Sequence, residues 1–339
     1  MGFTPWFRNQ ALALEGRPAR VFAVHRTGLE VKGEGGDVLV PMSGRWFQLE
    51  AEERPTVGDW VMVDDAGESV TEVLERSSVL QRMHPGRPHE VQLLAANVDL
   101  LIIVTSCNED FNPARLERYL ALADESGVTS LVVLTKADLV ESTERFEAEA
   151  RALRPDLEVL AVDATGEQVL EMLLPWCPPA STVALVGSSG VGKSTLLNAL
   201  AGGNLQKTQA IREDDGKGRH TTTHRSLHQL PHGALVVDSP GIRELALAGA
   251  ELNTVFEDIE GLALQCRFND CAHESEPGCA VRQAIADGSL DSRRLESYRK
   301  LQREDRVHRE SVAERHERVR RFGKQVKAAA AARQKRKEE

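Results

Sequence analysis

The stretch GSSGVGKST, at residues 187–195, combines glycines, a lysine and hydroxyl side chains in a spacing that holds phosphate. It fits the pattern G-x-x-x-x-G-K-S and lies between a strand-like and a helix-like run, a context that a chance glycine-serine turn would lack. Glycines let the backbone approach an anion closely, so amides at the helix start can surround the phosphates. Lys193 would contact the β- and γ-phosphates, and Ser194 would bind Mg²⁺. We therefore expect nucleotide contacts from Gly187, Ser188, Ser189, Gly190, Val191, Gly192, Lys193, Ser194 and Thr195.

A carboxylate suited to the same phosphate site follows the next apolar run. In ALVVDSPG, residues 234–241, Asp238 would approach Mg²⁺ through water, and the amide of Gly241 would face the γ-phosphate. The polar loop GKGRHTTTHR, residues 216–225, lies between the two motifs and is suited to close over the metal ion. Its metal-binding hydroxyl would be Thr222 or Thr223, and we favour Thr223.

Two loops earlier in the chain are expected to read the nucleotide base. In TKAD, residues 135–138, the Asp138 carboxylate would accept hydrogen bonds from the guanine N1–H and exocyclic amine, a donor pair that adenine lacks. Lys136 would lay its alkyl stem over the base. Thr135 stands where the motif usually has asparagine, which puts the hydrogen bonds that brace this loop in question. In VDATG, residues 162–166, the Ala164 amide would meet the guanine carbonyl. The expected contacts are Thr135, Lys136, Ala137, Asp138, Asp163 and Ala164.

The order of these motifs is unusual, because the base-reading loops precede the phosphate loop. A GTPase normally places them after it. The chain therefore has the motif order of a GTPase domain that was cut and rejoined, with residues of about 166–182 as the new connection. Domain termini usually lie close together at the surface, so such a permutation preserves the sheet and the site.

The chain resembles the RsgA (YjeQ/YloQ) family of circularly permuted GTPases, which assist maturation of the small ribosomal subunit. The resemblance covers nearly the whole chain, and its most specific segments are GKGRHTTT, DSPGIREL and DCAHESEPGCAV. It implies an N-terminal OB-fold domain, and GTP hydrolysis that the 30S subunit stimulates and that is coupled to release. It also implies binding to 16S rRNA near the decoding region.

A cluster of metal-ligand residues lies further along the chain, in CRFNDCAHESEPGC. Three thiolates and one imidazole form a closed tetrahedral set, which suits a single structural Zn²⁺ ion better than coincidental reduced cysteines. Cys107 and Cys177 lie outside this cluster, and we expect both to be structural. The expected zinc ligands are Cys266, Cys271, His273 and Cys279.

Hydrolysis requires a group that orients the attacking water, often a glutamine just after D-x-x-G. That position is Ile242, which has no suitable group. His220 in the polar loop is the nearest candidate, and the family resemblance favours it too; histidine can accept or relay a proton near neutral pH. A loop histidine that contacts only RNA or solvent is an equally open reading. His224 and His228 are weaker rivals.

The elements that must position these residues fall into several segments. Short alternating strands between glycines predict an OB-like β-barrel in residues 1–85. Apolar strands alternating with helices then predict a mostly parallel sheet, the α/β permuted GTPase domain of residues 86–250. An α-helical zinc-binding module is expected at 251–298, followed by a basic helical arm at 299–339.

Charge is unevenly distributed along the chain. Residues 299–339 contain 15 lysines and arginines against 7 acidic residues, whereas the whole chain has a net charge of −10. A basic arm on an acidic body favours contact with a polyanion, although a solvated charged helix is an equal alternative. In the barrel, RNA contacts are expected from Arg20, Lys32, Arg45 and Trp46, with a solvated surface role as the better interpretation of any single one.

Composition limits the class of protein. A hydrophobic content of 41% and a charged content of 28% are typical of a soluble globular protein, and no apolar run is long enough to span a bilayer. Five cysteines and the absence of a visible secretory signal favour the cytoplasm, and we expect a monomer with GTP or GDP and the 30S subunit as partners. The main alternative is a guanine-nucleotide-dependent RNA-binding module with negligible hydrolysis, which Ile242 favours. An ATPase is a distant third.

Overall fold

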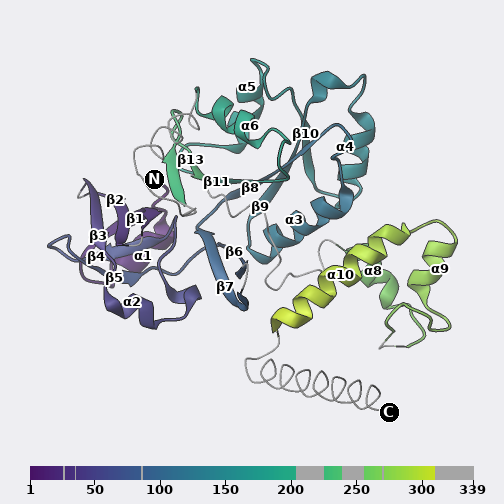
Figure 1. The fold of residues 1–339 in the computed structure, drawn as a ribbon, viewed down its shortest axis with the longest axis horizontal. Helices are drawn as coiled ribbons and strands as arrows, with labels where there is room; N and C mark the ends of the chain where they lie inside the picture. Colours follow the sequence, from purple (N-terminus) through teal and green to yellow (C-terminus); the bar gives the residue numbers. More distant parts are fainter. Residues whose placement is uncertain are drawn as a thin grey trace, which may run out of the picture.

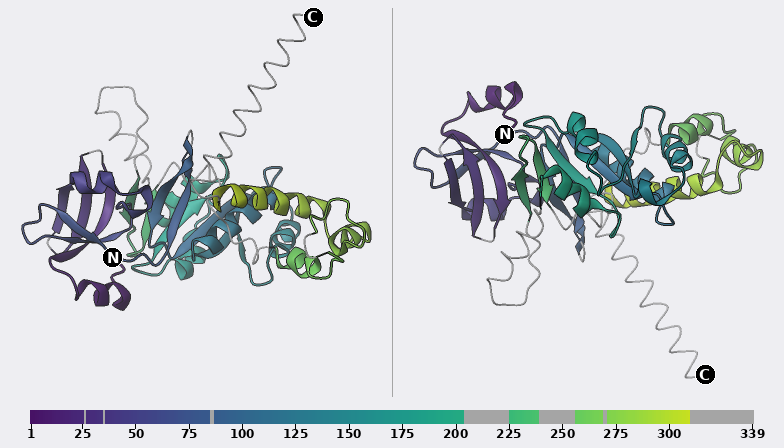
Figure 2. Two further views of the ribbon diagram at one scale, coloured as in Figure 1. Left: turned by 90° about the horizontal axis from the view of Figure 1, so that it is seen from below. Right: turned by 90° about the horizontal axis from the view of Figure 1, so that it is seen from above.

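The computed structural model describes residues 1–25, 27–34, 36–84, 87–203, 225–238, 256–268 and 271–309. The N-terminal strands, a central sheet covered by helices, and a group of C-terminal helices follow one another along the molecule (Figure 1). Figure 2 shows the same succession from two further sides, with the N-terminal strands and C-terminal helices at opposite ends. Among the described residues, no helix combines the length and apolar character needed to cross a membrane.

The N-terminal strands form an antiparallel sheet in the order β3–β2–β1–β4–β5. Val40 on β3 and Val70 on β5 belong to the same buried cluster, so the two ends of this sheet curl toward one core, as the predicted barrel-like domain requires. Three short helices accompany the strands: α1 (Pro5–Ala11), α2 (Gly44–Gln48) and η1 (Ala51–Glu53). The strands are β1 (Arg17–Val24), β2 (Gly28–Gly33), β3 (Gly36–Pro41), β4 (Trp60–Val63) and β5 (Val70–Val73).

Among the described residues, the central sheet carries five parallel strands in the order β10–β9–β8–β11–β13. Its strands are mostly apolar because both faces are covered: Leu101 and Ile103 face one buried cluster, and Ile102 and Val104 face the other. The mostly parallel sheet is as predicted. Its members are β8 (Leu100–Ser106), β9 (Thr129–Thr135), β10 (Glu158–Ala161), β11 (Thr182–Val186) and β13 (Leu235–Asp238).

Helices cover the two faces of this sheet. The helices α3 (Pro113–Glu125) and α4 (Glu144–Arg151) contribute to one buried cluster, and α5 (Val169–Leu173) and α6 (Lys193–Leu200) contribute to the other. The chain leaves β10 at the sheet edge, passes through α5 and η3 (Leu174–Trp176), and enters β11 beyond β9 and β8. This crossover is the connection predicted for residues 166–182, and it confirms the permuted arrangement.

Strand β12 (Ser226–Gln229) joins the barrel to the central sheet, a feature that the sequence pattern did not indicate. It runs antiparallel to β13 on one side and pairs with β1 on the other, where Ala23 lies opposite Ser226. A separate hairpin of β6 (Val79–His84) and β7 (Arg87–Ala96) lies between the barrel and the C-terminal helices in Figure 1. The predicted boundary after residue 85 falls between the two strands of this hairpin.

The C-terminal helices are α8 (Glu257–Ala263), α9 (Ala280–Ala286) and α10 (Ser292–Arg309). They pack on the α3 side of the sheet, because Phe256, Ile259 and Leu295 belong to the same buried cluster as Leu116 of α3. Arg294 of α10 lies 2.6 Å from Glu117 of α3 and 2.5 Å from Asp258 of α8. An ion-pair triad therefore joins the module of α8–α10 to the GTPase-like sheet.

Candidate nucleotide site and metal centre

Parallel strands place the predicted nucleotide-binding segments at one edge of the sheet. Strands β9, β10, β11 and β13 end at Thr135, Ala161, Val186 and Asp238, and each is parallel to its neighbour in the order β10–β9–β8–β11–β13. The carboxyl ends of parallel strands form the usual ligand crevice of an open α/β sheet. The structure therefore brings together segments that are separated by about fifty to one hundred residues in the chain.

The phosphate loop connects β11 to α6 and is fixed by close backbone packing. A Cβ atom at Gly187 would lie 2.1 Å from the carbonyl oxygen of Val104, and the φ angle of Gly187 is +142°. Only glycine tolerates this combination. The Lys193 Nζ donates hydrogen bonds to the carbonyl oxygens of Gly187, at 2.7 Å, and of Ser188. The lysine side chain thus folds back across the loop that is predicted to bind the phosphates.

Thr135, the residue that replaces the usual asparagine, is fully buried and contacts the phosphate loop. Its Oγ1 lies 2.5 Å from the carbonyl oxygen of Val191 and 3.1 Å from that of Thr105. A hydroxyl has one proton to donate, and the shorter distance assigns it to Val191. Threonine therefore supplies the bracing hydrogen bond that the substitution had put in question, between the base-reading and phosphate-binding loops.

Replacing Thr135 by valine keeps the shape of the side chain but leaves the buried Val191 carbonyl without this donor. An unsatisfied buried group costs about 1–3 kcal/mol, so we expect GTP affinity to fall by roughly five- to 150-fold. Titration with a fluorescent GTP analogue measures this loss. The matched control is Thr135→Ser, which keeps the hydroxyl and should bind within about threefold of wild type. Equal affinities of Thr135→Val and wild type would show that the contact does not brace the site.

The two base-reading loops are held to each other and shaped by local hydrogen bonds. Lys136 adopts a left-handed φ of 59°, and the Ala137 amide donates to the Val162 carbonyl at 3.3 Å. The Asp163 carboxylate accepts from the hydroxyl of Thr165 at 2.7 Å and from its amide at 2.8 Å. These hydrogen bonds, the hydroxyl one above all, lower the pKa of Asp163 and keep it ionised. The turn leaves Ala164 buried beside the loop that carries Asp138.

Asp138 lies in the short helix η2 (Ala137–Leu139) and is exposed at the sheet edge, where a base could reach it. Asp238 ends β13 and is partly buried, and Ser194 and Thr195 lie partly buried in the first turn of α6. The remaining predicted residues of this site lie outside the described residues: His220, Thr222, Thr223, His224, Gly241 and Ile242. His228 is among the described residues and lies on β12, opposite Val236 of β13. Its Nε2 is 2.8 Å from the Ser226 hydroxyl.

The four predicted metal ligands converge at the start of α9. The ligand atoms of Cys266, Cys271, His273 and Cys279 all lie within 4.8 Å of one another. Two thiolates on one tetrahedral Zn²⁺ at about 2.3 Å would be about 3.8 Å apart. The Cys266 and Cys279 sulfurs are 3.9 Å apart, and the His273 Nδ1 is 3.6 Å and 3.4 Å from them. The cluster could therefore hold one tetrahedral metal ion.

Cys107 and Cys177 are buried elsewhere and unpaired. Burial raises the pKa of both thiols to about 11, with the charge of Glu147 adding to the effect at Cys107. Both side chains therefore stay protonated near neutral pH and pack as small apolar groups, in agreement with the predicted structural role.

Arg20 was predicted as an RNA contact, and this prediction is wrong because its side chain is only 2% exposed. It donates hydrogen bonds to the carbonyls of Gly58 and Asn97, both at 3.1 Å, and to the Thr182 hydroxyl at 2.8 Å. Burial lowers the pKa of Arg20 to about 10, so it remains charged. Its contacts explain the burial, because the side chain reaches Thr182, the first residue of β11, and so connects the barrel to the central sheet.

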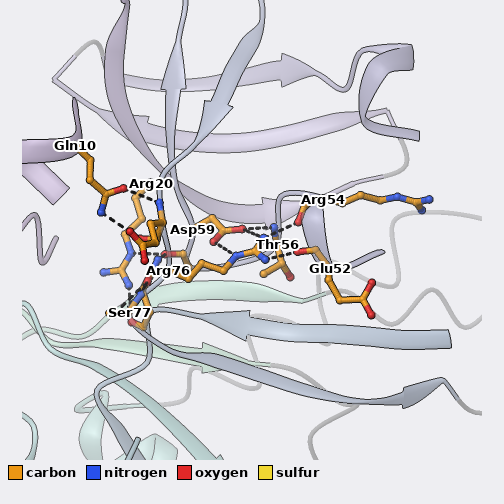
Figure 3. Close-up of polar contacts among 11 residues, drawn as sticks. Gln10, Arg20, Glu52, Arg54, Thr56, Asp59, Arg76 and Ser77 are labelled. Atoms are coloured by element: carbon orange, nitrogen blue, oxygen red, sulfur yellow. Dashed lines mark hydrogen bonds and ion pairs between the residues drawn. The ribbon is translucent and has the colours of Figure 1, made fainter. Parts of the chain in front are cut away.

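A buried ion pair between Asp59 and Arg76 lies near Arg20, and the sequence pattern did not indicate it. Asp59 is fully buried, and its two carboxylate oxygens lie 2.8 Å from Nε and Nη2 of Arg76. Its Oδ2 also accepts from the Thr56 amide at 2.7 Å. Figure 3 shows these groups converging between the barrel strands and the segment before β6. The arginine fork satisfies the hydrogen-bonding capacity of the buried carboxylate and fixes the geometry of this junction.

The other predicted barrel contacts differ from one another. Trp46 is 3% exposed, so the prediction that it contacts RNA is also wrong. Arg45 covers the Trp46 ring at 5.3 Å and is itself exposed, beside Glu72 at 3.5 Å. Lys32 forms an ion pair with Asp37 at 2.6 Å. Only Lys32 and Arg45 of the four predicted residues present a charge at the barrel surface.

Comparisons with known proteins give one consistent result. The family model described as RsgA GTPase matches residues 73–248. The chain is 45% identical to small ribosomal subunit biogenesis GTPase RsgA 2 of Vibrio vulnificus (strain CMCP6), over 96% of this chain and 92% of that protein. It is 46% identical to RsgA of Xylella fastidiosa (strain 9a5c), over 88% and 89%.

Two solved structures share the fold. YjeQ from Thermotoga maritima superposes with a TM-score of 0.62 at 26% identity, covering 85% of this chain and 98% of that one. YloQ, a circularly permuted GTPase, superposes with a TM-score of 0.56 at 25% identity, covering 87% and 96%. Each similarity covers most of both chains.

Proposed function

The chain belongs to the RsgA family of circularly permuted GTPases, and on this premise we propose that it hydrolyses GTP as a late maturation factor of the 30S ribosomal subunit. It binds 16S rRNA near the decoding region, the small subunit stimulates hydrolysis, and hydrolysis is coupled to release. The relatives named as small ribosomal subunit biogenesis GTPases support the partner. We propose that the protein acts in the cytoplasm as a monomer.

The observation that carries this proposal is the shared edge of the parallel strands. Loops after β9, β10 and β11 and the end of β13 meet there, and Thr135 joins the base-reading loop to the phosphate loop. In the proposed complex, Asp138 accepts hydrogen bonds from the guanine N1–H and amine, and the Ala164 amide donates to the guanine carbonyl. Lys193 contacts the β- and γ-phosphates.

The residues present fit a magnesium ion with the nucleotide. Ser194 and Asp238, joined by Thr223 from outside the described residues, would hold the ion, which supplies positive charge to the phosphate oxygens when bound. A hydroxyl and carboxylate set is the chemistry that Mg²⁺ prefers. At the cysteine cluster we propose Zn²⁺, because three thiolates and one imidazole leave no open position for catalysis.

We propose His220 as the group that orients or activates the attacking water. The sequence motif carries this assignment, since Ile242 offers no polar group at the usual position. A guanine-nucleotide-dependent RNA-binding module with negligible hydrolysis is the second candidate, and Ile242 is the feature that favours it.

The decisive measurement is GTP hydrolysis by the purified protein alone and with equimolar 30S or 50S subunits. We expect slow turnover alone and strong stimulation by 30S subunits only. His220→Ala should lose the stimulated turnover, whereas His228→Ala, which removes a weaker rival for the same role, should keep it. Competition by ATP should fail, because Asp138 selects guanine. Absence of stimulation by 30S subunits would favour the binding-module candidate instead.

A further inference from the structure

Arg115, in the first turn of α3, contacts the phosphate loop from outside the nucleotide-binding motifs. The helix starts with Pro113 and is capped by Asn112, whose side chain accepts a hydrogen bond from the Arg115 amide at 3.1 Å. The Arg115 guanidinium donates a hydrogen bond to the Ser188 hydroxyl. The carbonyl of Ser188 in turn accepts from the Nζ of Lys193. One loop residue therefore lies between two cationic side chains.

The place of Arg115 is fixed from the opposite side of α3. Residues two positions apart on a helix project about 200° apart, so Glu117 lies on the face away from Arg115. The Glu117 side chain is 3% exposed and forms its ion pair with Arg294 of α10 at 2.6 Å. The first turn of α3 is thus held between the phosphate loop and the C-terminal module.

The charge of Arg115 is available to a ligand. Within the part of the chain that the structure describes, no carboxylate forms an ion pair with Arg115, and its side chain is partly exposed. Its polar contact there is a neutral hydroxyl. A cation that is not neutralised by the protein strengthens the binding of a polyanion close to it. The effect is larger for a polyanion with more negative charge, such as a triphosphate compared with a diphosphate.

We propose that Arg115 is a positioning and specificity-determining residue of the nucleotide site. Its guanidinium fixes Ser188 and so the shape of the phosphate loop, and its charge favours a nucleoside triphosphate over a diphosphate. The inference rests on the proposed GTP complex, in which Lys193 contacts the terminal phosphates. Lysine is a poor substitute, because it lacks the planar fork that can contact a hydroxyl and a phosphate together.

The test compares Arg115→Ala, Arg115→Lys and wild type by titration with fluorescent analogues of GTP and GDP, without ribosomes. We expect Arg115→Ala to weaken GTP binding roughly tenfold and GDP binding no more than about threefold, as for loss of one charge-assisted contact. Arg115→Lys should recover part of the preference for GTP. The matched control is Arg145→Ala on α4, an 82% exposed side chain paired with Glu149, which should leave both affinities unchanged.

Comparing the effects of the Arg115 substitution on KM and on kcat distinguishes a positioning role from a merely structural one. In 30S-stimulated hydrolysis, Arg115→Ala should raise the KM for GTP and leave kcat within about twofold, since the contact is made before the transition state. Equal weakening of GTP and GDP, or affinities unchanged from wild type, would overturn the proposal. Because the titration needs no ribosome, failure of the proposed 30S stimulation would leave this test readable.

Discussion

Cys279→Ser is expected to abolish metal binding at the proposed zinc site and to unfold α8 and α9 locally. These helices have seven residues each, too short to be stable without tertiary support. Cys279 is buried, and its sulfur also accepts from the Arg282 amide at the start of α9. A structural zinc site contributes roughly 10–16 kcal/mol of apparent binding free energy, and replacing one of its thiolates removes much of it.

Loss of this module should also weaken the GTPase domain, because the two share a core. Phe256 and Leu295 are buried in the same cluster as Leu116. Burial raises the pKa of Glu117 and opposes its ionisation, whereas the charge of Arg294 favours it. Without Arg294 this carboxylate would be buried and unpaired, and removing one partner of a buried ion pair costs about 3–5 kcal/mol.

Elemental analysis of the purified protein and hydrogen exchange provide the measurement. Wild type should contain one zinc per chain, and Cys279→Ser should contain much less and lose amide protection in α8, α9 and the start of α10. Cys107→Ala, which changes a buried cysteine outside the cluster, is the matched control and should keep its zinc. Full metal content in Cys279→Ser would show that the cluster is not the metal site, and iron in place of zinc would contradict the choice of metal.

The meeting of the predicted nucleotide-binding loops at one sheet edge could be predicted because its determinants are local. Gly187 and Lys193 lie a few residues apart, and each predicted base-reading loop directly follows a strand of the parallel sheet, so strand order alone brings the loops together. Thr135 shows the limit of this reasoning. Whether its hydroxyl could replace an asparagine depended on the position of Val191, which lies more than fifty residues away.

The surface of the barrel could not be predicted in the same way. Arg20 and Trp46 lie in segments that look like exposed barrel strands and turns, but both are buried. Arg20 contacts Thr182 at the start of β11. The barrel also meets the central sheet where β1 pairs with β12, and the sequence of β12, SLHQ, is mostly polar and carries no strand signal of its own. Burial of a charged residue between domains is a tertiary property, and alternation within one strand does not reveal it.

Gly187→Ala is expected to abolish GTP binding, with an affinity loss of about a hundredfold or more. The new Cβ would lie 2.1 Å from the Val104 carbonyl oxygen, at a backbone φ of +142°. Val104 cannot withdraw easily, because its strand β8 lies between β9 and β11, with Ile103 opposite Val186. The loop must move instead, and a displacement of about 1 Å at a binding site can cost a hundredfold.

Alanine substitutions at two other glycines distinguish the effect of the clash on GTP affinity from the general effect of replacing glycine by alanine. Gly190, in the same loop, has a φ of +80°, and an alanine Cβ there would meet nothing within 4 Å, so Gly190→Ala reports backbone strain without the clash. Gly203 follows α6, has no left-handed φ and no neighbour within 4 Å, and Gly203→Ala should bind GTP as wild type does. Strain of this kind costs about 1–3 kcal/mol, so Gly190→Ala should fall between the other two.

Titration with a fluorescent GTP analogue ranks the GTP affinities of the three glycine variants, and thermal unfolding without nucleotide compares their stabilities. If Gly187→Ala binds as tightly as Gly203→Ala, the loop is free to adjust and its packing on β8 does not determine affinity. If instead Gly187→Ala loses binding while its unfolding temperature stays close to that of Gly190→Ala, the loss belongs to the site. The contact with Val104 then sets the position of the amides and of Lys193, and β8 supports the phosphate loop without touching the nucleotide.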